Sequence, residues 1–260
     1  MSKSVFVGEL TWKDYEARVG AGDCVMMLPV GALEQHGHHM CMNVDVLLPT
    51  AVCQRVAERI GALVLPGLQY GYKSQQKSGG GNHFPGTTSL DGATLTGTVQ
   101  DLIRELARHG ARQLVLMNGH YENSMFIVEG IDLALRELRY AGIGDFRVMV
   151  LSYWDFVNDP KVIEELYPEG FLGWDIEHGG VFETSLMLAL YPQLVNLDKV
   201  VDHPPATFPP YDLYPVDPAR TPAAGTLSSA RTASREKGEL ILRVCVEGIA
   251  QAISTEFSSA

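Results

Sequence analysis

Two short segments of the chain mirror each other, one running from Glu34 to His36 and the other from His120 to Glu122. Each segment places a carboxylate and an imidazole two residues apart, and each follows an apolar run that is typical of a buried strand. In an extended chain, residues i and i+2 point to the same side, so each segment can direct both polar side chains at one point. Two such pairs at strand ends predict a site for one or two metal ions.

The candidate metal ligands offer only oxygen and nitrogen donors. They are Glu34, His36, Asp45, His120 and Glu122. This donor set favours Zn²⁺ or Mn²⁺ over copper(I) or an iron–sulfur cluster. Five ligands exceed what one tetrahedral zinc ion needs, so we expect two divalent ions with Asp45 as a bridge. Three carboxylates and one hydroxide would balance the charge of two such ions, and a bridging hydroxide is the nucleophile that a two-metal hydrolase forms at neutral pH.

A third polar segment, from Trp174 to Gly180, places His178 beside two glycines and just before a predicted helix. His178 could be a further metal ligand, a capping or core residue, or a proton shuttle. Because the mirrored pairs already supply the metal ligands, we favour the shuttle, a role that histidine performs well near neutral pH. Glu183 could orient His178 or be an ordinary helix-face carboxylate, and we assign it no role.

Other polar and aromatic residues near these segments have more ambiguous roles. The loop from Lys77 to His83 contains three consecutive glycines, which fit either a lid or substrate wall or a solvent-exposed turn. Trp154 and Trp174 flank the predicted site and suit a flat or cationic small ligand, although core packing is the commoner use of tryptophan. For His38 and His39, which lie outside the two-residue pattern, we favour structural or supporting roles.

The composition excludes several classes of protein. The 260 residues carry 20 Lys and Arg against 31 Asp and Glu, and the net charge of −11 argues against a nucleic-acid partner. No apolar run approaches membrane-spanning length, and the N-terminal residues lack a signal core, so we expect a cytoplasmic protein. No two of the four cysteines form a C-x-x-C pair, and we interpret all four as structural thiols.

Apolar runs alternate with helical patterns along the chain. Predicted strands are Cys24–Val30, Ala62–Leu65, Gln113–Met117 and Phe146–Leu151. Predicted helices are Leu47–Ile60, Ala93–His109 with Asp91 as its cap, Asn123–Tyr140, Gly180–Leu190 and Glu236–Phe257. This alternation predicts an α/β fold with a mostly parallel sheet, in a single domain over residues 1–260. Both mirrored segments and Trp154 follow strands, at the edge where open parallel sheets hold their active sites.

Six segments together resemble the creatininase family over essentially the whole chain. They are Gly31–Gly37, Asn43–Asp45, Ser78–Gly81, His83–Thr87, Asn118–Asn123 and Trp174–Gly180. The resemblance implies a three-layer α/β/α domain, a homohexamer, and a binuclear centre that accepts Zn²⁺ or Mn²⁺.

The resemblance also implies roles for individual residues. It assigns Glu34, Asp45 and His120 to one ion, and His36, Asp45 and Glu122 to the other. It places His178 and Glu122 in catalysis. The implied substrate contacts are Ser78, Tyr121, Trp154, Trp174, Asp175 and His178, with Trp154 as a mobile aromatic residue near the pocket.

The activity implied by the resemblance is the reversible hydrolysis of the cyclic amide creatinine to creatine. A related formamide hydrolase acting on a pyrimidine precursor is one alternative, but its phosphate- or ribose-bearing substrate would require basic side chains. Lys73 and Lys77 are the obvious loop candidates for that task. A non-catalytic metal-dependent binding protein is another alternative, and it would need the metal ligands but no shuttle such as His178.

The proline-rich segment 203–222 generates a prediction about assembly. A loop of this length inside a compact domain is usually functional or part of an interface, so we expect the protein to be oligomeric. Sedimentation analysis should show a species several times heavier than one chain. A stable, active monomer would contradict this expectation.

Overall fold

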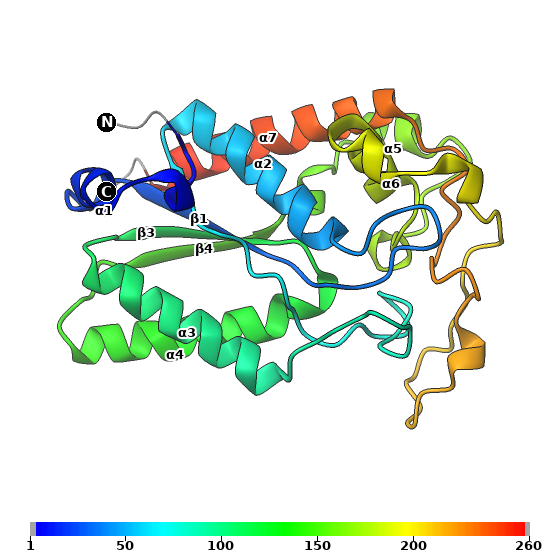
Figure 1. The fold of residues 1–260 in the computed structure, drawn as a ribbon, viewed down its shortest axis with the longest axis horizontal. Helices are drawn as coiled ribbons and strands as arrows, with labels where there is room; N and C mark the ends of the chain where they lie inside the picture. The colour runs from blue at the N-terminus through cyan, green and yellow to red at the C-terminus, as the bar shows by residue number, and fades with distance from the viewer. Residues whose placement is uncertain (1–3, 258–260) are drawn as a thin grey trace.

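The computed structural model describes residues 4–257 and is built around a four-stranded sheet whose strands all run parallel (Figure 1). The strands are β1 (Val25–Val30), β2 (Leu63–Val64), β3 (Gln113–Asn118) and β4 (Arg147–Ser152), in the order β2-β1-β3-β4. In the ladder Val30 pairs with Asn118, and Asn118 pairs with Ser152. Three strands therefore end at the same level, and the segments that follow them meet at one edge of the sheet.

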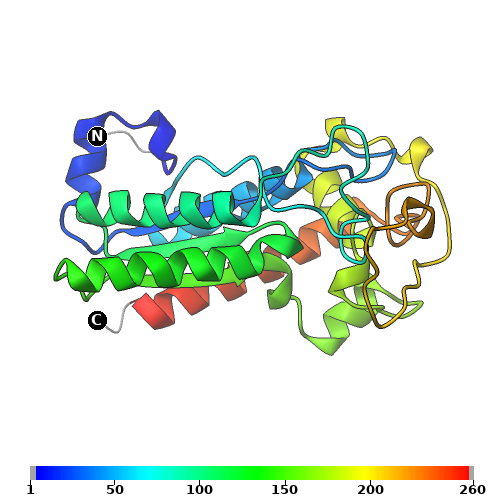
Figure 2. The same ribbon diagram turned by 90° about the horizontal axis from the view of Figure 1, so that it is seen from below.

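Helices cover both faces of the sheet, which confirms the three-layer α/β/α arrangement (Figure 1, Figure 2). One layer holds α2 (Val44–Ile60) and α7 (Arg235–Phe257), and the other holds α3 (Gly92–Arg108) and α4 (Ser124–Tyr140). The shorter helices are α1 (Trp12–Val19), α5 (Pro160–Leu166) and α6 (Val181–Leu190), of which α6 packs against α7. The loops that leave the carboxyl ends of the strands gather at the end of the molecule opposite α1.

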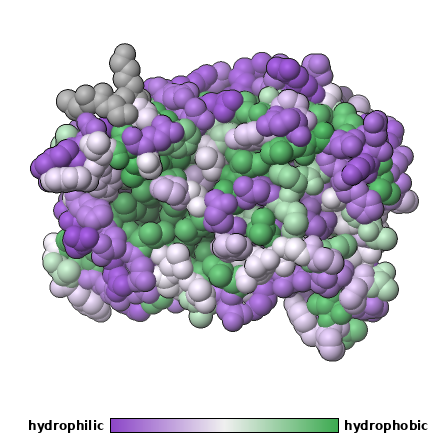
Figure 3. Space-filling model, in the orientation of Figure 1, coloured by the Kyte–Doolittle hydropathy of each residue, from purple (hydrophilic) through white to green (hydrophobic). Residues whose placement is uncertain are grey.

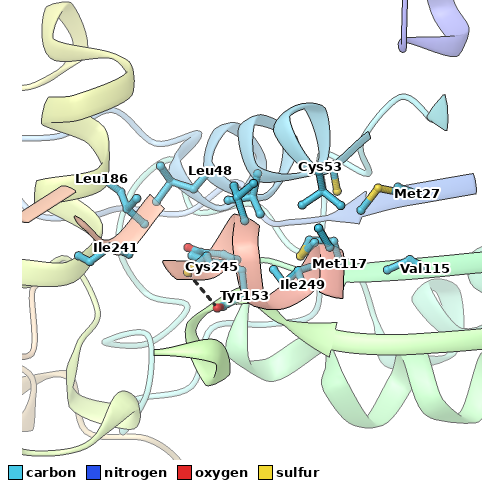
Figure 4. Packing of buried hydrophobic residues seen from close by; sticks show 14 of the residues in the cluster. Met27, Leu48, Cys53, Val115, Met117, Tyr153, Leu186, Ile241, Cys245 and Ile249 are labelled. Atoms are coloured by element: carbon cyan, nitrogen blue, oxygen red, sulfur yellow. Dashed lines mark hydrogen bonds between the residues drawn. The ribbon is translucent and has the colours of Figure 1, made fainter. Parts of the chain in front are cut away.

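Alternate residues of the central strands pack into opposite layers, as the two-residue period of a strand requires. Met27 and Met117 belong to the core on the α2 and α7 side, which Figure 4 shows. Leu114 and Leu116 belong to the core under α3 and α4. Burial on both faces explains why these strands are continuous apolar runs in the sequence, without a polar alternation.

All the strands and helices predicted from the sequence are present, and their ends agree to within three residues. Helices α1 and α5 were not predicted, because they are short and bury few side chains. Helix α2 begins at Val44 and not at Leu47, so Asp45 lies in its first turn. The predicted side-chain cap by Asp91 is wrong, because this residue occupies the N-cap position but pairs with Lys73 instead.

Two glycines let the first turn of α2 approach the strand ends. Gly31 directly follows β1, and Gly119 directly follows β3. A Cβ atom added to either glycine would overlap the backbone carbonyl oxygen of Asp45. The absence of a side chain at these positions therefore sets the place of Asp45 relative to both mirrored segments.

The proline-rich segment 203–222 packs over residues 75–78 of the same chain. Lys77 Nζ lies 2.9 Å from Asp212 Oδ1, and the Tyr214 hydroxyl donates a hydrogen bond of 3.2 Å to Gln75 Oε1. This segment therefore supports the loop that carries Ser78. Its participation in a subunit interface stays a prediction.

The outer edge of the sheet is partly open. Strand β4 has its neighbour β3 on one side only, and its residue Val150 is 41% exposed. The face of the molecule opposite to this edge, which Figure 3 shows, also has apolar side chains gathered on it. Natural proteins usually cover or protect such an edge, so the expected subunit contact can be sought here first.

Within residues 4–257, no helix combines the length and the apolar character that crossing a membrane requires.

The close approach at Gly119 can be tested by adding one methyl group. We expect Gly119→Ala to lower the free energy of unfolding by about 1–3 kcal/mol, because the methyl group would push the first turn of α2 away. Gly97→Ala in α3 is a matched control, since its added Cβ would meet no atom within 4 Å. The control should gain about 0.5–1 kcal/mol from better helix propensity. Denaturant unfolding measures both, and equal changes would contradict the packing argument.

Candidate metal centre

The five predicted metal ligands converge at the carboxyl edge of the sheet. Glu34 and His36 lie on the loop after β1, Asp45 on the first turn of α2, and His120 and Glu122 after β3. The first four of these side chains are almost completely buried. The second mirrored segment is not fully extended, because His120 has strand-like angles but Tyr121–Asn123 forms a 3₁₀ turn.

One group of ligand atoms surrounds the Nδ1 atom of His120. Glu34 Oε1 lies 3.2 Å and Asp45 Oδ2 lies 3.1 Å from this nitrogen. One ligand atom from each of these residues lies within 4.8 Å of the other two. Glu34 Oε2 is buried and forms no hydrogen bond with a described residue. A buried carboxylate oxygen without a donor is unfavourable, so these residues fit a bound cation.

A second group surrounds the Nε2 atom of His36. Asp45 Oδ1 lies 3.0 Å and Glu183 Oε1 lies 3.7 Å from this nitrogen. The two oxygens of Asp45 therefore face two different histidines, as a bridging carboxylate must. Glu183, on the first turn of α6, is a carboxylate to which the sequence analysis assigned no role.

Both histidines are oriented by backbone carbonyl groups. His120 Nε2 lies 3.0 Å from the carbonyl oxygen of Tyr72, and His36 Nδ1 lies 3.1 Å from that of Glu34. A nitrogen that donates its proton to a carbonyl leaves the other ring nitrogen free to bind a metal. In each case the free nitrogen is the one that faces Asp45.

The electrostatic field at this site favours cations. Burial lowers the pKa of His36, but the carboxylates of Asp45 and Glu183 outweigh it and hold that pKa well above 6.5. Burial likewise opposes the charged form of Asp45, yet the imidazoles of His36 and His120 hold its pKa below the ordinary value. The same field that attracts protons to the histidines would attract divalent ions.

Glu122 lies beside His120 and outside the group around His36. Its Oε1 accepts hydrogen bonds from the Ser78 hydroxyl at 2.7 Å and the Gln75 backbone N–H at 2.8 Å. Its Oε2 lies 3.3 Å from His120 Nε2. The assignment of Glu122 to the second ion stays a prediction, and Glu183 is the carboxylate that the structure brings to His36.

His178 faces the metal ligands from the segment before α6. Its Nδ1 lies 3.5 Å from Glu34 Oε1, and its Nε2 lies 2.9 Å from the side-chain nitrogen of Gln35. Burial lowers the pKa of His178, and the nearby charge of Glu34 does not compensate, so the imidazole is neutral at neutral pH. Glu34, His36 and His178 also form a third group whose ligand atoms lie within 4.8 Å of one another.

The glycine-rich loop is a wall of the site. A Cβ atom added to Gly79 would lie 3.0 Å from Glu34 Oε2 and 3.2 Å from Glu122 Oε1. Gly79, Gly80 and Gly81 are all buried, so the alternative of a solvent-exposed turn is wrong. The absence of a side chain at Gly79 lets the backbone lie against the metal carboxylates.

A cavity of about 50 Å³ adjoins these groups. Its lining includes the predicted substrate contacts Ser78, Tyr121, Trp154, Trp174 and His178. Asp175 is exposed and does not belong to the wall that the described residues form. The sequence analysis gave no role to four of the lining residues, namely Tyr153, Glu177, Phe182 and Glu183. Position after a strand could have indicated Tyr153, but no local signal distinguishes the others.

The lining of the cavity combines acidic and aromatic side chains. Its carboxyl groups belong to Glu34, Asp45, Glu122, Glu177 and Glu183. Burial raises the pKa of Glu177 to about 8, so this carboxyl group is largely neutral near pH 7. None of the described lining residues is Lys or Arg. The cavity therefore suits an uncharged or cationic small molecule better than an anion.

Known proteins resemble this chain over nearly its whole length. A sequence profile of the creatininase family, described as creatinine amidohydrolase, matches residues 8–253. The chain therefore belongs to the creatininase family and is a hydrolase. Creatinine amidohydrolase of Pseudomonas putida is 90% identical to it over 257 residues, which cover 99% of each chain.

Solved creatininase structures show the same fold. An E122Q mutant creatininase complexed with creatine is 89% identical and superimposes with a TM-score of 0.97, covering 98% of this chain and 99% of that one. A Zn–Zn form of an E122Q mutant creatininase has a TM-score of 0.98 at 89% identity, with the same coverage. A manganese form of creatininase has a TM-score of 0.97 at 90% identity, again with that coverage.

The shared position of Asp45 generates a prediction about metal content. We expect Asp45→Ala to weaken binding of both ions together, because each oxygen of Asp45 faces a different ligand group. His36→Ala should weaken chiefly one ion. Titration of the metal-free variants with Mn²⁺ or Zn²⁺, followed by metal analysis, measures both effects.

Loss of a single ion in both variants would show that Asp45 does not bridge. The same titration of Glu122→Gln and Glu183→Gln would identify the third ligand of the second ion. The variant that lacks this ligand should retain one tightly bound ion and lose the other.

Proposed function

We propose that this protein is a metal-dependent cyclic amidohydrolase that converts creatinine to creatine reversibly. The observation that carries the proposal is the buried Asp45, whose two oxygens face two histidine-containing ligand groups beside an aromatic cavity. The names of the similar proteins support the choice of substrate. Hydrolysis adds a water oxygen to the ring carbonyl carbon, breaks the ring C–N bond, and moves one proton to the leaving nitrogen.

The residues around Asp45 would hold two divalent ions, Zn²⁺ or Mn²⁺. Glu34, Asp45 and His120 would hold one ion, and His36 and Asp45 would hold the other with a carboxylate from Glu122 or Glu183. When bound, these ions would activate a water molecule and polarise the substrate carbonyl group.

His178 would move the proton. The Gln35 side-chain nitrogen donates to the carbonyl oxygen of Gly225 at 2.8 Å and also faces His178 Nε2 at 2.9 Å. Because that nitrogen is a donor, His178 Nε2 accepts and its Nδ1 carries the proton. Nδ1 faces Glu34 at the metal group, so the proton that His178 can exchange lies inside the site.

The aromatic side chains that line the cavity suit the substrate. Trp174 and Phe182 pack edge to face with ring centroids 5.0 Å apart, and Trp154 lines the same cavity. A flat five-membered ring can pack against such surfaces, and the guanidinium group of creatine is a cation that aromatic faces attract.

The alternatives from the sequence analysis are less well supported. A formamide hydrolase whose substrate carries phosphate would need cationic side chains, and the described residues of the cavity wall include neither Lys nor Arg. A non-catalytic metal-binding protein would not need a buried neutral histidine facing the ligands.

A turnover assay decides between these functions. Purified protein supplied with Mn²⁺ or Zn²⁺ should interconvert creatinine and creatine, a chelator should abolish the reaction, and added metal should restore it. Turnover by metal-free protein, or no turnover of either compound with metal present, would overturn the proposal.

The role of His178 can be separated from metal binding. We expect His178→Ala to lower the turnover rate by about 10²–10⁴-fold, the usual effect of losing a positioned general acid. Metal content and melting temperature should stay near those of the unmodified protein. His38→Ala is a control, because His38 is exposed, and its rate should stay within about twofold.

The other roles for His178 give different results. If this residue is a metal ligand, the variant should lose metal, and added Mn²⁺ should restore much of the rate. If it is a structural residue, the melting temperature should fall while the rate per folded molecule stays normal. Normal turnover would remove His178 from the mechanism.

A further inference from the structure

The hydroxyl group of Tyr153 is a hydrogen-bond donor that the protein leaves unused. Tyr153 directly follows β4, is 0% exposed, and lines the cavity together with Asp45 and Glu183. Its Oη atom forms no hydrogen bond with any of the described residues. A buried hydroxyl group without a partner is unfavourable, which indicates that its partner enters the cavity from outside.

Two other polar groups at the metal end of the cavity are already engaged. The Ser78 hydroxyl donates to Glu122 at 2.7 Å, and His120 Nε2 faces the Tyr72 carbonyl oxygen at 3.0 Å. The described wall contains five carboxyl groups and neither Lys nor Arg. Negative charge that develops on a substrate oxygen therefore needs donors, and Tyr153 offers an uncommitted one.

The Tyr153 ring is held in place from several sides. Its backbone carbonyl oxygen accepts a hydrogen bond of 3.2 Å from the Cys245 thiol (Figure 4). Its ring packs edge to face on Trp154 at 5.2 Å and stacks on Phe182 at 6.1 Å between centroids. Burial raises the pKa of Tyr153 well above its ordinary value, and the negative charges of Glu183 and Asp45 raise it further. The hydroxyl group therefore keeps its proton and a fixed direction.

We propose that Tyr153 is a catalytic residue that donates a hydrogen bond from its Oη to the carbonyl oxygen of the scissile amide. The inference rests on the proposed hydrolysis. When the water oxygen bonds to the carbonyl carbon, the C=O electron pair moves onto the oxygen, where the Tyr153 O–H stabilises the new charge. The pair returns as the ring C–N bond breaks, and Tyr153 keeps its own proton throughout.

Tyr153→Phe tests this role because it removes one oxygen and keeps the packed ring. We expect kcat for creatinine to fall by about 10²-fold, the usual effect of losing one oxyanion donor. KM should change by less than about threefold, because the hydrogen bond strengthens only in the transition state. Metal content should be unchanged, and the melting temperature should stay equal or rise, because the lost hydroxyl has no partner in the folded protein.

Tyr191→Phe is a matched control. The Tyr191 side chain is partly buried and packs against the same core cluster as Tyr153, but it does not line the metal cavity. Its kcat should equal that of the unmodified protein. A similar loss in both variants would show a general effect of removing tyrosine hydroxyl groups and would overturn the proposal.

The remaining outcomes are equally decisive. A Tyr153→Phe protein with normal kcat, with less bound metal, or with a clearly lower melting temperature would overturn the catalytic role. The unmodified protein is assayed in parallel. If it does not hydrolyse creatinine, the proposed function fails together with this inference, whereas normal hydrolysis by both proteins overturns only the role of Tyr153.

Discussion

The structure depends on one electrostatic constraint, the removal of several carboxylates and imidazoles from water at a single point. Asp45 is at its centre, with one oxygen 3.0 Å from His36 and the other 3.1 Å from His120. Such a cluster is stable only if the charges are matched, and Glu34 Oε2 still lacks a donor among the described residues. Divalent cations supply the missing positive charge, so metal binding and the stability of this part of the fold are linked.

The fold serves this constraint by bringing three chain segments to one level. Strands β1 and β3 end side by side, and the first turn of α2 lies against both ends because Gly31 and Gly119 carry no side chains. The Gly79 backbone then closes the cluster from another side. Each of these contacts joins residues far apart in the sequence, and the rigid core on both sheet faces holds them in place.

The composition of the cavity wall limits what chemistry it can perform. Its carboxyl groups attract metal ions and repel anions, and its aromatic side chains make the rest of the wall less polar. Two polar hydrogens that remain available for a reaction belong to neutral groups, the imidazole of His178 and the hydroxyl of Tyr153. Neutral donors can stabilise or transfer charge without competing with the metal ions for the carboxylates.

The sequence by itself determined the parallel α/β fold, the mirrored pairs and their place after strands, because apolar runs and short polar motifs are local properties. Only the tertiary structure brought Glu183 to His36, turned Tyr153 into the cavity, and left Asp175 on the surface beside two lining residues. In the sequence, Glu183 resembles any helix-face carboxylate and Tyr153 any core aromatic residue. The direction of such side chains depends on how α6 and the turn after β4 pack against distant strand ends. A local sequence pattern cannot predict this packing.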